Sequence, residues 1–69
     1  MKNIDLVFGI DDNYSKYCTI AIQSILSHLN SNYKLNIAII YEKLSIKSLN
    51  NFKTIKSKQL NKIRFHKFF

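Results

Sequence analysis

The chain is poor in the residues from which several common kinds of site are built. Its 69 residues include one cysteine, one glycine and no proline. The single cysteine, Cys18, excludes an internal disulfide framework and a cysteine-rich metal site, and it is typical of a reducing compartment. The single glycine, Gly9, excludes the Gly-rich dinucleotide fingerprint and the Walker phosphate loop, because both turns need more than one glycine.

Long apolar runs are also missing. No segment approaches the roughly 20 apolar residues that a membrane span requires, and Asp5 interrupts the only stretch that could form a signal-peptide core. We therefore expect no transmembrane segment and a cytoplasmic location. A chain of 69 residues forms at most one small domain, and such a domain buries only about 60% of the surface of its unfolded chain.

Acidic residues are scarce. Four Asp and Glu stand against eleven Lys and Arg, which gives a net charge of +7. This balance is typical of proteins that bind nucleic acid or anionic lipid. The cations are concentrated in the second half but spread along it, however, and only one of them, Arg64, is an arginine. A solvated basic face explains this pattern, so we expect no nucleic-acid partner, and a small basic module that binds nucleic acid or an acidic partner is the alternative.

Apolar periodicity predicts strands that alternate with helices. The first apolar run indicates a strand covered on both faces, as in a parallel sheet, and later runs of β-branched or alternating residues indicate two more strands. Helical spacing and a serine that can act as a cap predict two helices between them. The predicted strands are 4–10, 35–41 and 62–69, and the predicted helices are 15–29 and 45–57.

The apolar stripes of these helices predict which residues face a core. The stripe of the second helix drifts around its axis and is the weaker of the two. The core-facing residues are Cys18, Ala21, Ile22, Ile25 and Leu29 in the first helix and Ile46, Leu49, Phe52 and Ile55 in the second. Strands and helices in this order imply right-handed βαβ units. The predicted fold class is α/β, an incomplete Rossmann-like nucleotide-binding half in the order β-α-β-α-β with parallel strands.

A polar loop follows the first predicted strand. Ligands of open α/β sheets bind outside the carboxyl ends of the strands, and this loop brings two carboxylates, an amide and a phenol to that place. Uracil suits these groups, because its ring N–H can donate to a carboxylate, its carbonyls can accept from an amide, and its face can stack on a phenol. The candidate nucleotide-binding residues of this loop are Gly9, Asp11, Asp12, Asn13 and Tyr14. In the alternative interpretation, Asp12 or Asn13 caps the following helix and the ring of Tyr14 packs against the sheet edge.

The stretch Leu6–Tyr14 resembles the opening strand and loop of retaining glycosyltransferases of family 8. These enzymes include bacterial lipopolysaccharide galactosyltransferases and glucosyltransferases, with glycogenin as a relative. The resemblance continues in collinear order through 17–29, 35–41, 44–52 and 61–65. It implies that 1–69 is a single partial domain, the amino-terminal UDP-sugar-binding portion of a GT-A type fold. It also implies that the positions of Asp11, Asn13 and Tyr14 contact uridine and that Gly9 lends backbone contact and keeps the base pocket open.

The same resemblance bears on catalysis. Family members coordinate Mn²⁺ and the donor diphosphate through an Asp-any-Asp motif after a later strand, but no aspartate follows Asp12. We therefore expect no metal site, no catalytic residue and no transferase activity in this chain alone. A complete relative would transfer a hexose from UDP to lipopolysaccharide or another saccharide acceptor, in the cytoplasm or at the inner face of the membrane. A further interpretation is that a chain with unpaired sheet edges forms no stable protein.

Overall fold

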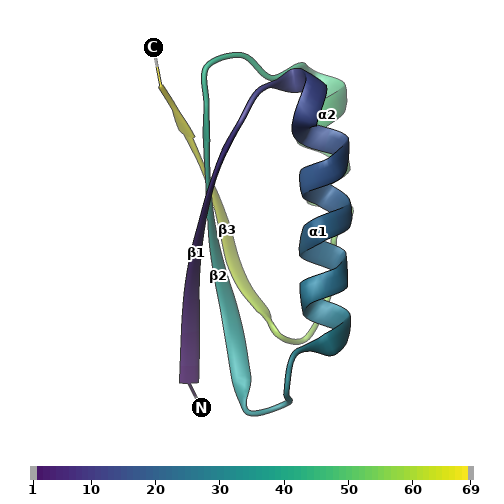
Figure 1. Ribbon diagram of the computed structural model, residues 1–69, viewed down its shortest axis with the longest axis vertical. Helices are drawn as coiled ribbons and strands as arrows, with labels where there is room; N and C mark the ends of the chain where they lie inside the picture. Colours follow the sequence, from purple (N-terminus) through teal and green to yellow (C-terminus); the bar gives the residue numbers. More distant parts are fainter. Residues whose placement is uncertain (1, 69) are drawn as a thin grey trace.

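The computed structural model describes residues 2–68 and confirms the α/β fold (Figure 1). Three parallel strands form one sheet in the order β1-β2-β3, and helices connect them, as in a partial Rossmann-like half. Phe69, the last residue of the third predicted strand, lies outside the described residues. The elements are β1 (Lys2–Ile10), the 3-10 helix η1 (Asp12–Tyr14), α1 (Ser15–His28), β2 (Tyr33–Tyr41), α2 (Ile46–Lys53) and β3 (Leu60–Lys67).

Strand β2 lies at the centre of the sheet. It pairs with β1 in an unbroken register from Lys2↔Tyr33 to Ile10↔Tyr41, and with β3 in a register that shifts between Leu35 and Asn36. Parallel strands cannot be joined by a tight hairpin, so each connection crosses over the sheet through a helix. Both helices cover the same face (Figure 1). Because β1 and β2 are parallel, the loops that follow them reach the same edge of the sheet.

The core lies between the helices and this face of the sheet. Alternation along β2 turns Leu35, Ile37 and Ile39 toward the helices, where all three are buried. Phe52 of α2 is fully buried and meets the ring of Phe65 edge-on, with 5.7 Å between the ring centroids. The remaining buried apolar residues are Cys18, Ile22, Leu26 and Ile55.

The other face of the sheet carries no helix. Every second residue of β1 is exposed, so the prediction of a strand covered on both faces is wrong for the described residues. The reason is topological, because both crossovers pass over one face. A polar ladder crosses the open face near the amino ends of the strands. Asn36 Nδ2 donates to Asp5 Oδ1 at 2.9 Å, and Asn61 Nδ2 donates to Asn36 Oδ1 at 2.8 Å.

The helices differ from their predictions in detail. Helix α1 matches the predicted span to within a residue, but it also buries Leu26, which the predicted stripe omitted. Helix α2 begins after Ser45, whose side chain accepts from Ser48 N–H as predicted for a cap. It ends at Lys53, earlier than predicted. Ile46 is 77% exposed, contrary to the predicted stripe, because it lies about 240° around the helix axis from Phe52, which faces the sheet.

Replacement of Phe52 by alanine is expected to unfold most of the chain. Removal of a buried phenylalanine costs about 3–5 kcal/mol. At about 0.05–0.15 kcal/mol each, 69 residues provide about 3–10 kcal/mol in all, and so small a domain lies toward the lower end because it buries little of its surface. Ile46→Ala on the same helix is the matched control and should change the free energy of unfolding by less than about 0.5 kcal/mol. Urea denaturation followed by circular dichroism measures both variants, and equal midpoints would contradict the proposed core.

Candidate functional site

The loop after β1 forms a short 3-10 turn that presents its side chains at the carboxyl edge of the sheet. Asp11 has an extended backbone, and its Oδ1 accepts a hydrogen bond from Tyr14 N–H at 3.1 Å. This contact caps η1 and uses one oxygen of the carboxylate. The other oxygen, Oδ2, accepts no hydrogen bond from the described residues, so it is free to accept one from a ligand.

Asp12 connects the loop to the start of α2. Its Oδ1 accepts from Ser48 Oγ at 2.6 Å and from Ser45 N–H at 3.0 Å. The hydroxyl of Ser15, at the start of α1, lies 2.9 Å from Ser48 Oγ and 3.0 Å from the carbonyl oxygen of Asp12. The hydrogen bonds from Ser48 and then Ser45 hold the pKa of Asp12 below its ordinary value. Asp12 thus holds the starts of the two helices together, and the helix whose N-terminus it binds is α2 rather than α1.

Three of the predicted site residues line one open hollow of about 410 Å³. Gly9, Asp11 and Tyr14 form one wall of it, and the end of β2 and Phe68 form the other. Tyr14 is 63% exposed, so it does not pack into the sheet edge as the alternative interpretation requires. A Cβ atom built on Gly9 meets nothing within 4 Å, so the glycine leaves the hollow open. We call this space the β1 hollow.

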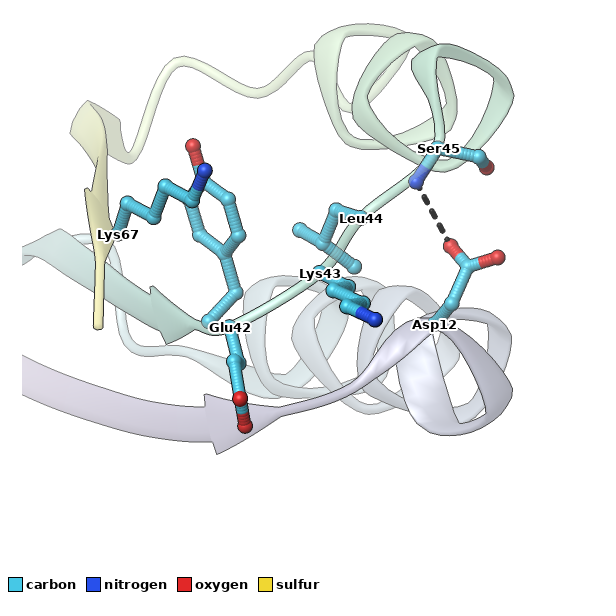
Figure 2. A pocket seen from close by; sticks show the side chains of 7 residues that line it. Asp12, Glu42, Lys43, Leu44, Ser45 and Lys67 are labelled. Atoms are coloured by element: carbon cyan, nitrogen blue, oxygen red, sulfur yellow. Dashed lines mark hydrogen bonds between the residues drawn. The ribbon is translucent and has the colours of Figure 1, made fainter. Parts of the chain in front are cut away.

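The two other predicted residues lie apart from the β1 hollow. Asn13 is exposed in the middle of η1 and does not line it. Asp12 lines a neighbouring hollow of about 560 Å³, on the side of the sheet that carries the helices (Figure 2). We call this second space the β2 hollow. It is lined by Asp12, Tyr41, Glu42, Lys43, Leu44, Ser45 and Lys67.

The residues that sequence reasoning missed lie at the carboxyl ends of the second and third strands or just after them. Tyr41 and Glu42 line both hollows, Phe68 lines the β1 hollow and Lys67 the β2 hollow. A signal for them was present, because the carboxyl ends of parallel strands meet at one edge. The loop motif alone did not point to them, since they lie far from it in the sequence.

The described residues do not supply a metal centre. No group of three or more His, Cys, Asp or Glu side chains that could hold a metal ion occurs within residues 2–68. The donor set therefore does not fit Mn²⁺, which needs oxygen-rich coordination, and we assign no catalytic step to this chain. Burial raises the pKa of the Cys18 thiol, which suits an inert core residue rather than a nucleophile. Across the same residues, no helix is long and apolar enough to cross a membrane.

Comparison with known proteins found no relatives. The chain matches no protein-family model, no curated protein and no solved structure at a significant level. The site is therefore interpreted from its own geometry and from the motif in its sequence.

The hydrogen bonds of Asp12 predict an acid-sensitive contribution to stability. Because the folded-state pKa lies below the ordinary value of 3.8, this contribution is complete well above pH 3.8 and is lost as the pH falls through the lowered pKa. Asp12→Asn and Ser48→Ala should both flatten the acid limb of the stability curve, measured by urea denaturation between pH 7 and pH 2.5. Ser24→Ala, a serine on the exposed side of α1, should leave the slope unchanged. An unaltered slope in both test variants would show that the contacts of Asp12 add no stability.

Proposed function

We propose that this chain is the amino-terminal, uridine-binding part of a retaining family 8 glycosyltransferase that uses a UDP-hexose donor. One observation carries the proposal. Gly9, Asp11 and Tyr14, which the motif predicts to contact uridine, line the same hollow at the carboxyl edge of a parallel sheet. That edge is where open α/β folds bind their ligands.

The chemistry of the β1 hollow supports recognition of a pyrimidine. Asp11 Oδ2 is available to accept the ring N–H of uracil, and the exposed Tyr14 ring offers a stacking surface. Phe68 provides a second aromatic wall, 64% exposed. The open space above Gly9 gives a flat base room to approach the strand.

Transfer of the sugar also needs a metal ion at the diphosphate and a site for the acceptor, and residues 2–68 do not supply the metal ligands. In a complete enzyme, Mn²⁺ would neutralise the donor diphosphate, and the hexose would pass to lipopolysaccharide or another saccharide acceptor with retention of configuration. The chain by itself would bind the nucleotide weakly and transfer nothing. A cytoplasmic location is part of this proposal.

Titration with UDP, followed by protein NMR, tests the proposal. We expect chemical-shift changes confined to 9–14 and to the end of β2. Asp11→Asn should weaken binding about tenfold or more, because an amide N–H₂ replaces the acceptor Oδ2 while Oδ1 still caps η1. Asp5→Asn, in the amino-terminal half of β1, is the matched control and should bind UDP like the unmodified chain.

A short single-stranded oligonucleotide serves as the competing ligand in the same titration. Shifts with the oligonucleotide but not with UDP would overturn the proposal and favour the basic binding module. A spectrum without dispersion would show that the chain forms no stable domain under the conditions used.

Gly9→Val is expected to block the β1 hollow without harming the fold. The backbone of Gly9 has no positive φ, a Cβ meets nothing within 4 Å, and a β-branched side chain suits a strand. We expect UDP shifts to disappear while the urea midpoint stays the same or rises. Gly9→Ala is the milder control, with a gain of about 0.4–1 kcal/mol in stability and a smaller loss of binding. Undiminished UDP binding to Gly9→Val would place the ligand elsewhere.

A further inference from the structure

We propose that the amino-terminal end of the sheet is a docking surface for a bilayer of anionic lipid. Five lysines form this surface, which we call the lysine end. They are Lys2, Lys34, Lys56, Lys58 and Lys62. The inference goes beyond the proposed function and does not depend on it, because the lysine end and the β1 hollow lie at opposite ends of the strands (Figure 1).

Two turns bring these lysines together. The turn before β2 and the turn before β3 lie side by side, because Gln59 Nε2 donates to the carbonyl oxygens of Leu29 and Asn30 at 3.2 and 2.6 Å. The start of β1 joins them, since Lys2 N–H donates to the carbonyl oxygen of Asn32 at 3.0 Å. Lysines that are spread along the sequence are thereby gathered at one end of the folded chain.

The positive charge of the protein is concentrated at this end. Among residues 2–68, the five lysines stand against one carboxylate there, Asp5, whose Oδ1 already accepts a hydrogen bond from Asn36. The carboxyl end of the sheet, in contrast, has four lysines and three carboxylates, so it is nearly neutral. They are Lys16, Lys43, Lys47, Lys67, Asp11, Asp12 and Glu42.

The two ends are too far apart for these carboxylates to offset the lysine end. Lys34 and Tyr41 lie about 23 Å apart along β2, whereas the screening length in physiological salt is about 8 Å. An acidic surface that approaches the amino ends of the strands therefore meets a cluster of cations with little opposing charge.

The lysine end also contains a hollow of about 360 Å³ with no acidic residue in its lining. Lys34 and Lys58 line it together with Ser31, Tyr33 and Gln59. Ammonium groups on flexible stems can donate to the oxygens of a phosphate that enters this space. The other three lysines of this end are exposed. One lipid headgroup can thus lie in the hollow while the exposed lysines contact neighbouring headgroups.

The kind of cation favours a lipid surface over a nucleic acid. A lysine is a compact charge that attracts an anionic surface without fixed geometry, whereas the fork of an arginine suits phosphates and bases held in one orientation. Proteins that bind single strands also offer exposed aromatic rings on which bases stack, but Tyr33, the aromatic residue of the hollow, is half-buried. Each lysine close to an anionic bilayer raises the affinity about fivefold.

Cosedimentation with lipid vesicles tests the inference. The chain should bind vesicles made of equal parts phosphatidylcholine and phosphatidylglycerol, release them at high salt, and fail to bind vesicles of phosphatidylcholine alone. A variant with glutamine at four exposed lysines of the lysine end should bind the anionic vesicles at least about tenfold more weakly. These changes are Lys2→Gln, Lys56→Gln, Lys58→Gln and Lys62→Gln.

The matched control removes the same charge from exposed lysines at the carboxyl end of the sheet. It should lose less than about threefold in affinity for the same vesicles, because these lysines lie outside the docking surface. The control changes are Lys16→Gln, Lys43→Gln, Lys47→Gln and Lys67→Gln.

Circular dichroism establishes that both variants are folded. If the fourfold test variant unfolds, the double variant Lys56→Gln and Lys58→Gln, confined to the turn before β3, replaces it, with Lys43→Gln and Lys47→Gln as its control. An equal loss in test and control would show that net charge alone governs binding and would overturn the inference. Absence of binding to the anionic vesicles would overturn it as well.

Two further titrations separate this inference from its alternatives. A single-stranded oligonucleotide that binds more tightly than the vesicles and loses affinity in the test variant alone would assign the lysine end to nucleic acid and overturn the inference. The test variant should bind UDP like the unmodified chain. Failure of the unmodified chain to bind UDP would overturn the proposed function, while the vesicle result would still decide the docking surface.

Discussion

The packing of one face of β2 against both helices is the constraint on which the structure depends. Leu35, Ile37 and Ile39 are buried because alternation turns them toward α1 and α2, and the large side chains of Ile22 and Phe52 complete the layer. Both crossovers must then pass over that face. Because each connection is a crossover, all three strands run in one direction and their carboxyl ends gather at one edge. The two hollows exist because of that shared edge.

A second constraint fixes the shape of this edge. Asp12 comes from the loop after β1, whereas Ser45 and Ser48 come from the start of α2, more than thirty positions later. Their hydrogen bonds hold the first loop against the second, with Ser15 adding a link from α1. Asp12, which the motif places among the ligand-binding residues, therefore makes its hydrogen bonds to other parts of the protein. Its neighbours Asp11 and Tyr14 are left facing the β1 hollow.

Local patterns were sufficient to predict the elements and their order, because strand alternation and helical spacing are properties of neighbouring residues. Coverage of the sheet was not predictable in this way. The run containing Val7 and Gly9 is apolar enough for a buried strand, and only the path of both crossovers leaves these residues exposed. The early end of α2 follows similarly from tertiary packing, since Ile55 is buried in the turn after the helix. Partners distant in sequence, such as Asp12 and Ser48, give no local signal.

The open face of the sheet differs between its two ends. Near the amino ends, Asp5 and Asn36 satisfy each other and suit contact with water. Toward the carboxyl ends, the exposed side chains of Val7, Ile40 and Phe68 are apolar, and Arg64 and His66 of β3 lie beside them. Burial of apolar surface away from water is favourable, so the base that we propose for the β1 hollow would find its apolar contacts at the carboxyl end of this face, away from the polar ladder.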